Sequence, residues 1–82
     1  MIQFTFKNKT WSPVEIWNSG FRELWYERRT KAIPFKETQN FIDSWSHEEQ
    51  IAIGNLLHNI PTSVSANTDL GWYCLKLWMQ TV

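Results

Sequence analysis

Six tryptophans among 82 residues are the feature that most constrains how this chain can fold. Trp is seldom fully buried even in large domains, and a chain this short buries only about 60–65% of the surface that its unfolded form exposes. Two interpretations therefore stay open: most indoles pack the core with their N–H at its edge, or two or three of them form an exposed patch. Exposed aromatic patches mark partner-binding surfaces, because Trp, Tyr and Arg are the commonest hot-spot residues.

The rest of the composition narrows the class of protein. At this length we expect a single domain over residues 1–82, and 43% hydrophobic with 20% charged residues is typical of a globular protein. Eight basic and eight acidic side chains cancel, which argues against a highly basic nucleic-acid coat and against an acidic DNA mimic. No apolar run approaches the roughly 18 residues of a membrane helix, so we expect no membrane association.

One residue type indicates the cellular compartment. Cys74 is the single cysteine, so the chain cannot form an intrachain disulfide. Met1–Lys9 lacks the apolar stretch of a signal peptide. Because disulfides are rare in reducing compartments, this pattern predicts a cytoplasmic protein.

Alternating residues at the two ends of the chain predict a sheet. Ile2, Phe4 and Phe6 alternate with polar residues, as in a strand with one buried face, and Asn8–Thr10 is expected to form the turn after it. Gly71–Val82 fits a strand, because aromatic residues and Cys follow a Gly, but it also fits a helix that is apolar nearly all round. We favour a strand paired with the first one. One face of this strand would carry Trp72, Cys74, Lys76 and Trp78, and the opposite face would carry Tyr73, Leu75, Leu77 and Met79.

The first predicted helix has both a start signal and a weak point. Ser12-Pro13-Val14-Glu15 combines an N-cap, a proline at the first helical position and a capping-box glutamate. Asn18-Ser19-Gly20 is expected to kink the helix, because glycine costs a helix about 1 kcal/mol relative to alanine. Ile16 and Tyr26 fall off the main apolar stripe and are expected to be exposed. At 3.6 residues per turn that stripe comprises Val14, Trp17, Phe21, Leu24 and Trp25.

Two further helices are predicted after Thr30–Pro34, which is expected to be a linker or a short edge strand. One side of a second, shorter helix is expected to carry Phe35, Phe41, Ile42 and Trp45. Ser46-His47-Glu48-Glu49 repeats the capping-box pattern, so a third helix should begin at His47 and be stopped by Pro61. The apolar face of the third helix comprises Ala52, Ile53, Leu56, Leu57 and Ile60. Thr62–Asp69 is expected to be a polar loop.

These elements together predict an α+β fold, with three short helices packed on a small antiparallel sheet formed by the N- and C-terminal strands. The alternative is an all-α fold, if residues 70–82 are helical. Two strands alone are marginally stable in water, so their free edges could also pair with a second copy and form a homodimer.

The sequence contains no complete catalytic or metal-binding pattern. His47-Glu48-Glu49-Gln50-Ile51 begins like the zinc-protease helix, but Ile51 stands where the second His is needed. His58 would lie about 16 Å further along the helix axis, too far to share a metal with His47. Cys74 has no surrounding nucleophile signature, and the three glycines are isolated rather than part of a phosphate loop. We therefore predict no metal site, no cofactor and no enzymatic activity.

Charge is unevenly distributed along the chain. Residues 1–36 hold seven basic and three acidic side chains, a net charge of +4, whereas residues 37–82 hold one basic and five acidic side chains, a net charge of −4. These two oppositely charged parts of the chain either form ordinary solvated faces or produce an electric field that steers a charged partner toward the protein.

The candidate partner-binding residues are aromatic and arginine side chains that the predicted elements leave off the core: Trp11, Arg22, Tyr26, Arg28, Arg29, Trp72 and Trp78. We expect a small non-enzymatic protein-binding module, most simply a stoichiometric inhibitor or modulator that occludes a surface of a protein partner. In size, aromatic content and lack of catalytic motifs the chain resembles inhibitors that phages encode against host machinery, anti-CRISPR proteins included. The alternative is a small nucleic-acid-binding regulator that uses an Arg/Trp/Tyr patch, which the neutral net charge disfavours.

Overall fold

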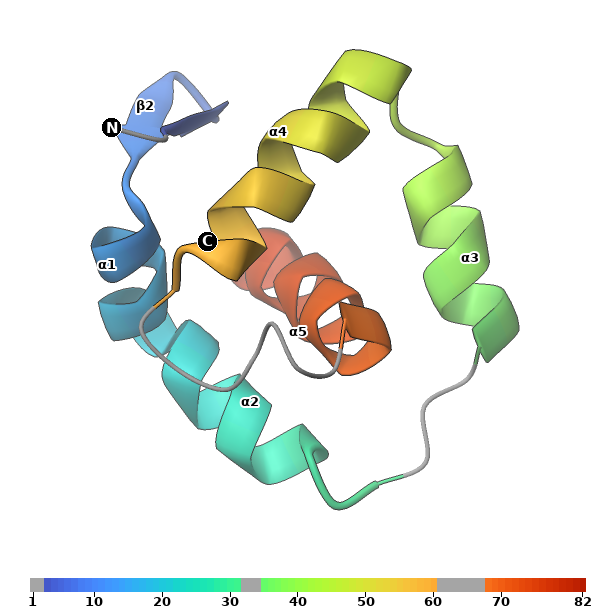
Figure 1. Ribbon diagram of the computed structural model, residues 1–82. Helices are drawn as coiled ribbons and strands as arrows, with labels where there is room; N and C mark the ends of the chain where they lie inside the picture. Colours follow the sequence, from blue (N-terminus) through green and yellow to red (C-terminus); the bar gives the residue numbers. More distant parts are fainter. Residues whose placement is uncertain (1–2, 32–34, 61–67) are drawn as a thin grey trace.

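The computed structural model describes residues 3–31, 35–60 and 68–82, and within these ranges the chain is mostly helical with a small antiparallel sheet (Figure 1). The fold is thus α+β in the broad sense predicted, but with four helices rather than three when residues 13–28, which run on as one kinked helix, are counted once. The additional helix is the C-terminal segment that the sequence analysis expected to be a strand. The elements in chain order are β1 (Phe4–Phe6), β2 (Lys9–Trp11), α1 (Pro13–Ile16), η1 (Trp17–Phe21), α2 (Arg22–Arg28), α3 (Phe35–Asp43), α4 (His47–His58) and α5 (Thr68–Thr81).

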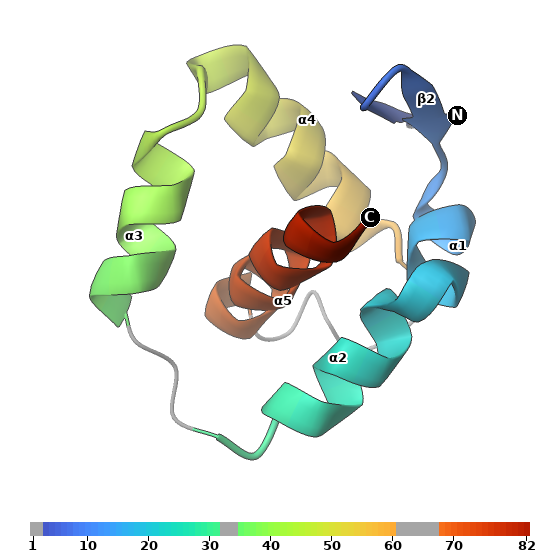
Figure 2. The same cartoon turned by 180° about the vertical axis from the view of Figure 1, so that it is seen from behind.

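The predicted C-terminal strand is wrong, because Thr68–Thr81 forms the longest helix, α5. This helix lies in the middle of the molecule and packs against α2, α3 and η1 (Figures 1 and 2). A helix with neighbours on several sides needs apolar residues at most positions, so its sequence loses the one-sided stripe of a surface helix. Its fully buried side, at helical spacing, comprises Leu70, Gly71, Cys74, Leu75 and Trp78.

The first predicted strand is confirmed at Phe4–Phe6, whereas Ile2 lies outside the described residues. Its partner is β2 rather than the C-terminal segment. The turn consists of Lys7 and Asn8, both with positive φ, so Lys9 and Thr10 belong to a strand and the predicted turn at Asn8–Thr10 is wrong. Positive φ at both central residues is the geometry of a tight two-residue hairpin. The hairpin register pairs Phe4 with Trp11, Thr5 with Thr10 and Phe6 with Lys9.

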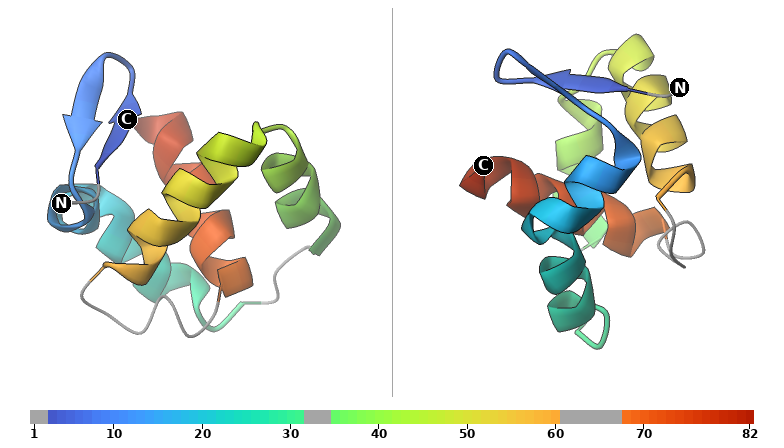
Figure 3. Two further views of the ribbon diagram at one scale, coloured as in Figure 1. Left: turned by 45° about the horizontal axis from the view of Figure 1, so that its top comes forward. Right: turned by 90° about the vertical axis from the view of Figure 1, so that its left-hand side faces the viewer.

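One face of the hairpin covers the C-terminal half of α5 (Figure 3). The rings of Phe6 and Trp11 have centroids 6.1 and 4.9 Å from that of Trp78, and Trp11 meets it edge-on at 85°. Edge-to-face aromatic pairs of this kind add about 0.5–1.5 kcal/mol beyond the area that they bury. A hairpin too small to be stable alone is therefore held in place by aromatic packing on a helix.

The start of the first helix is confirmed in detail. The Ser12 hydroxyl accepts from the Glu15 amide, and the Glu15 side chain accepts from the Ser12 amide, which completes the capping box. The predicted kink is also confirmed, since Ser19 and Gly20 leave helical geometry and Gly20 has φ 106°.

The kink changes which residues upstream of it are buried. Val14 is exposed and Ile16 is fully buried, the reverse of the prediction. The turn at η1 closes over five residues rather than four, which inserts about one residue, or roughly 100° of rotation, into the helical register. The buried positions before the kink are consequently Pro13 and Ile16, one residue earlier than an uninterrupted stripe requires.

The third predicted helix, α4, begins at His47 as expected, with the Ser46 hydroxyl accepting from the Glu49 amide. Its buried side follows the prediction at Ile53, Leu56 and Leu57, whereas Ala52 is exposed. Ile60 is buried as predicted but follows the end of the helix. The helix ends at His58, and the predicted stop at Pro61 lies outside the described residues.

The remaining predicted connections are described only in part. The helix α3 ends at Asp43, so Trp45 follows the helix instead of lying on it. Of the predicted linker, Thr30 and Lys31 fall within the described ranges. The predicted loop at Thr62–Asp69 lies mostly outside them, and its last two residues already belong to α5.

Candidate protein-binding surface

The predicted binding residues separate into core and surface groups, and Trp11 and Trp78 belong to the core. Their exposed fractions are 8% and 1%, so the expectation that they lie off the core is wrong. The Trp78 indole N–H donates to Ser19 Oγ at 2.8 Å, and the Trp11 indole N–H donates to the Phe6 carbonyl at 3.4 Å. The expectation for Trp78 depended on a C-terminal strand, whereas in α5 the side chain points with Cys74 into the core.

Trp72 is half-buried and packs against another aromatic side chain. Its ring lies 5.3 Å from that of Trp45, and Trp45 in turn lies 4.3 Å from Phe41. All three rings are half-buried, and they join α3 and the segment after it to α5. This cluster is absent from the predicted binding residues apart from Trp72, although the spacing of four residues between Phe41 and Trp45 indicates that their side chains can meet.

Three predicted residues do share an exposed surface, which we call the Tyr26 surface: Arg22, Tyr26 and Arg29. Their spacing of four and then three residues places them on one face of α2 and its C-cap. All three are exposed, and Tyr26 is 52% exposed, as predicted from its position off the apolar stripe.

Two contacts hold the Tyr26 ring in position. Its centroid lies 6.1 Å from that of Trp17, with the planes at 61°, and the Arg29 guanidinium carbon lies 5.1 Å above the ring. Contacts between an arginine and an aromatic face are worth about 0.5–1 kcal/mol at exposed sites. Side chains before and after Tyr26 in the chain therefore support the exposed aromatic ring, which lowers the entropy lost when a partner covers it.

Arg28 does not join the Tyr26 surface. It is only partly exposed, and its Nε atom is buried without a hydrogen-bond partner in the described structure. Burial raises the pKa of the nearby Cys74 thiol to about 12, and the positive charge of Arg28 acts in the opposite direction more weakly. The Cys74 thiol is fully buried and donates to the Leu24 carbonyl at 3.7 Å. Because its pKa is raised and it is buried, the thiol is protonated and inaccessible at neutral pH.

Acidic residues lie among the arginines of α2. Glu23 pairs with Arg22 at 3.8 Å, and Glu27 pairs with Arg28 at 3.9 Å and with Lys31 at 3.8 Å. Such exposed pairs add little stability, but they do cancel charge. The helix therefore offers an aromatic residue with mixed charges around it rather than a uniformly basic strip.

The comparisons with known proteins identify no related protein. No protein-family model, no curated protein and no solved structure matches this chain. In the ranges that the structure describes, no three His, Cys, Asp or Glu side chains are grouped so that they could hold a metal ion. No helix in those ranges has the length and hydropathy needed to cross a membrane.

Proposed function

We propose that this protein is a small non-enzymatic protein-binding module, a stoichiometric inhibitor or modulator that covers a surface of its partner with the Tyr26 surface. The observation that supports the proposal is the Tyr26 ring, half exposed yet held between Trp17 and Arg29. A folded monomer gains little from presenting a supported aromatic ring to water, whereas Tyr and Arg side chains dominate the energetics of protein interfaces.

The charge pattern favours a protein partner over a nucleic acid. Glu23 and Glu27 are paired with three of the basic residues on and after α2, and the net charge of the chain is zero. Nucleic-acid affinity comes mainly from unpaired basic side chains that neutralise phosphates. A surface of mixed charge instead suits a protein surface with complementary charges, which sets the orientation of binding.

The class of partner follows from the profile of the chain. Small phage-encoded inhibitors act by covering functional surfaces of host proteins, and this chain resembles them in size, aromatic content and lack of catalytic motifs. Affinity capture with the intact chain, followed by mass spectrometry, is the direct way to obtain a partner.

The proposal is tested on the captured partner with Tyr26→Ala and a matched control, Ile51→Ala, because Ile51 on α4 is 51% exposed. We expect Tyr26→Ala to cost about 2 kcal/mol of affinity or more, roughly 30-fold in Kd, and Ile51→Ala to leave Kd within about twofold. Equal affinities for the two variants would refute the role of Tyr26.

Salt dependence separates the two classes of partner. We expect binding to a protein partner to survive about 0.5 M salt, because the anchor is aromatic and charges are screened at that ionic strength. An affinity that falls steeply with salt, together with recovery of nucleic acid from the capture, would instead favour the alternative regulator.

A further inference from the structure

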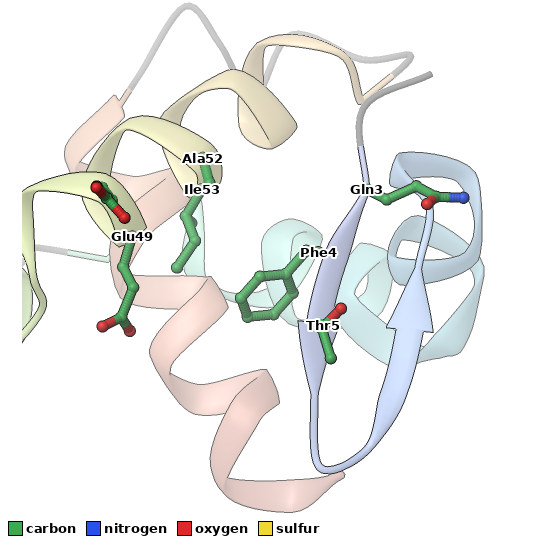
Figure 4. A pocket seen from close by; sticks show the side chains of 7 residues that line it. Gln3, Phe4, Thr5, Glu49, Ala52 and Ile53 are labelled. Atoms are coloured by element: carbon green, nitrogen blue, oxygen red, sulfur yellow. The ribbon is translucent and has the colours of Figure 1, made fainter.

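A second surface lies away from α2, in an open groove of about 370 Å³ between β1 and α4 (Figure 4). Its apolar part is formed by Phe4 on the strand and by Ala52 and Ile53 on the helix. Figure 4 shows the Phe4 ring directed toward the helix, facing Ile53 across the groove. A ligand in this groove would therefore contact apolar side chains from both walls.

The strand wall has backbone groups that β2 leaves without a partner among the described residues. After a two-residue turn the first pair, Phe6 and Lys9, is the hydrogen-bonded one, so the next pair, Thr5 and Thr10, is not hydrogen-bonded. Their hydroxyl oxygens lie 3.4 Å apart, as expected for the closer side chains of such a pair. The amide and carbonyl of Thr5 consequently point away from β2.

The side of β1 that faces away from β2 is the side on which α4 lies. The strand β1 lies between β2 and α4 in both views of the ribbon (Figures 1 and 2), and Thr5 lines the groove beside Phe4. Side chains at Phe4 and Thr5 lie on opposite faces of the strand, so a groove lined by both runs along the strand edge. A free edge of this kind is a template for one more strand.

The helix wall supplies charge. Glu48 and Glu49 line the groove, and neither has an ion pair with a described residue, whereas Glu15, Glu23 and Glu37 each pair with a Lys or Arg. The N-terminus of α4 explains why acidic residues are favoured here, but its dipole amounts to only about half of one positive charge. The groove therefore keeps a net negative charge that a basic side chain would neutralise.

We infer that the groove binds an extended segment of a partner protein, which adds to β1 as a third strand. One side chain of the segment is Lys or Arg and lies near Glu48 and Glu49, and a neighbouring aliphatic side chain packs on Phe4, Ala52 and Ile53. Backbone hydrogen bonds to Thr5 set the direction of the segment, and the carboxylates select its charge. This inference goes beyond the proposed function, because it requires neither Tyr26 nor α2.

The probe is a short fluorescent peptide of alternating valine and lysine, compared with one of alternating valine and glutamate, in anisotropy titrations with the intact chain. We expect the lysine peptide to bind and the glutamate peptide to bind at least about tenfold more weakly. Failure of the lysine peptide to bind up to about 1 mM, the weak limit of specific recognition, overturns the inference.

Two adjacent exposed residues of α4 give a matched pair of variants. Ala52→Trp fills the groove, whereas Ile51→Trp adds the same side chain outside it. We expect Ala52→Trp to weaken peptide binding by about tenfold or more, and Ile51→Trp to change it by less than about twofold. Equal binding by the two variants, each shown to be folded by its melting curve, contradicts the inference.

A second variant decides the matter if Ala52→Trp does not fold. The double change Glu48→Gln and Glu49→Gln keeps size and polarity but removes the charge, so the affinity for the lysine peptide should fall several-fold and lose most of its salt dependence. The Thr5 amide should also exchange more slowly with solvent when the peptide is bound, and unchanged exchange rules out strand addition.

Light scattering at the same protein concentrations identifies the competing occupant. We expect that the molecular mass of the protein does not rise with concentration through contacts made in the groove. A mass that increases with concentration for the wild-type chain and for Ile51→Trp, but not for Ala52→Trp, would show that a second copy fills the groove and would overturn the assignment to a partner segment.

Discussion

The indole N–H of Trp78 donates to the hydroxyl of Ser19 at 2.8 Å, and that hydroxyl donates in turn to the Ile16 carbonyl at 2.8 Å. The first bond joins residues 59 positions apart in the chain. It satisfies the polar atom of a fully buried tryptophan and ties α5 to the kink of the first helix. The helix interruption at η1 thus provides the partner that lets a tryptophan occupy the core.

Ser19→Ala should remove that partner and leave a buried N–H without an acceptor. The expected cost is about 1–3 kcal/mol in the free energy of unfolding, measured by urea denaturation. Ser44→Ala is the control, because the Ser44 hydroxyl donates only to the Phe41 carbonyl at an exposed position. Equal stability of the two variants would show that the bond to Trp78 is not needed.

Two glycine substitutions should change stability in opposite directions. Gly20 has φ 106°, and a Cβ there would meet no atom within 4 Å, so Gly20→Ala acts through backbone strain alone and should destabilise by about 1–2 kcal/mol. Gly54 is helical, and its Cβ would meet Trp72 at an ordinary contact distance of 3.9 Å. Gly54→Ala should therefore stabilise by up to about 1 kcal/mol. Thermal melting of both variants is the measurement, and shifts of the same sign would contradict the kink geometry.

The two sides of α4 should respond differently to truncation. Leu57 is buried, so Leu57→Ala should lower the free energy of unfolding by about 2–5 kcal/mol. Ile51 on the same helix is half exposed, so Ile51→Ala should change it by no more than about 0.5 kcal/mol. Chemical denaturation of the two variants compares them directly, and similar losses would mean that the helix faces are assigned wrongly.

Cys74 should be inert in the folded protein. Burial raises its pKa from an ordinary value of 9.0 to about 12, and only the thiolate is nucleophilic. Iodoacetamide at pH 8 should therefore label the native protein far more slowly than the protein in denaturant. Rapid native labelling would show that the thiol is accessible.

The same pKa shift predicts a pH dependence of stability. Above pH 9 the unfolded chain loses the Cys74 proton, while the folded chain keeps it up to about pH 12. The unfolded state then binds fewer protons, so stability from this group is complete below pH 9 and falls as the pH rises between these values. The difference in unfolding free energy between the wild type and Cys74→Ala should decrease across that window, and a constant difference would contradict the shift.

Local chemistry made several features predictable from the sequence alone. The helix starts after Ser12 and Ser46 depend on a hydroxyl and a glutamate three residues apart, and the kink depends on a glycine that tolerates positive φ. The exposure of Tyr26 followed from helical periodicity downstream of the kink. Each of these outcomes is decided by residues within about one or two turns of each other.

Contacts between distant segments decided the rest. The helix α5 is covered on several sides, which erases the stripe that identifies a surface helix and leaves a pattern that also fits a strand; this error then placed Trp78 on an open face. The predicted burial of Val14 and the predicted exposure of Ile16 are reversed in the structure, because one extra residue at η1 rotates the part of the helix before it. Periodicity describes a segment with one buried side and an unbroken register, and only the packed structure shows where either condition fails.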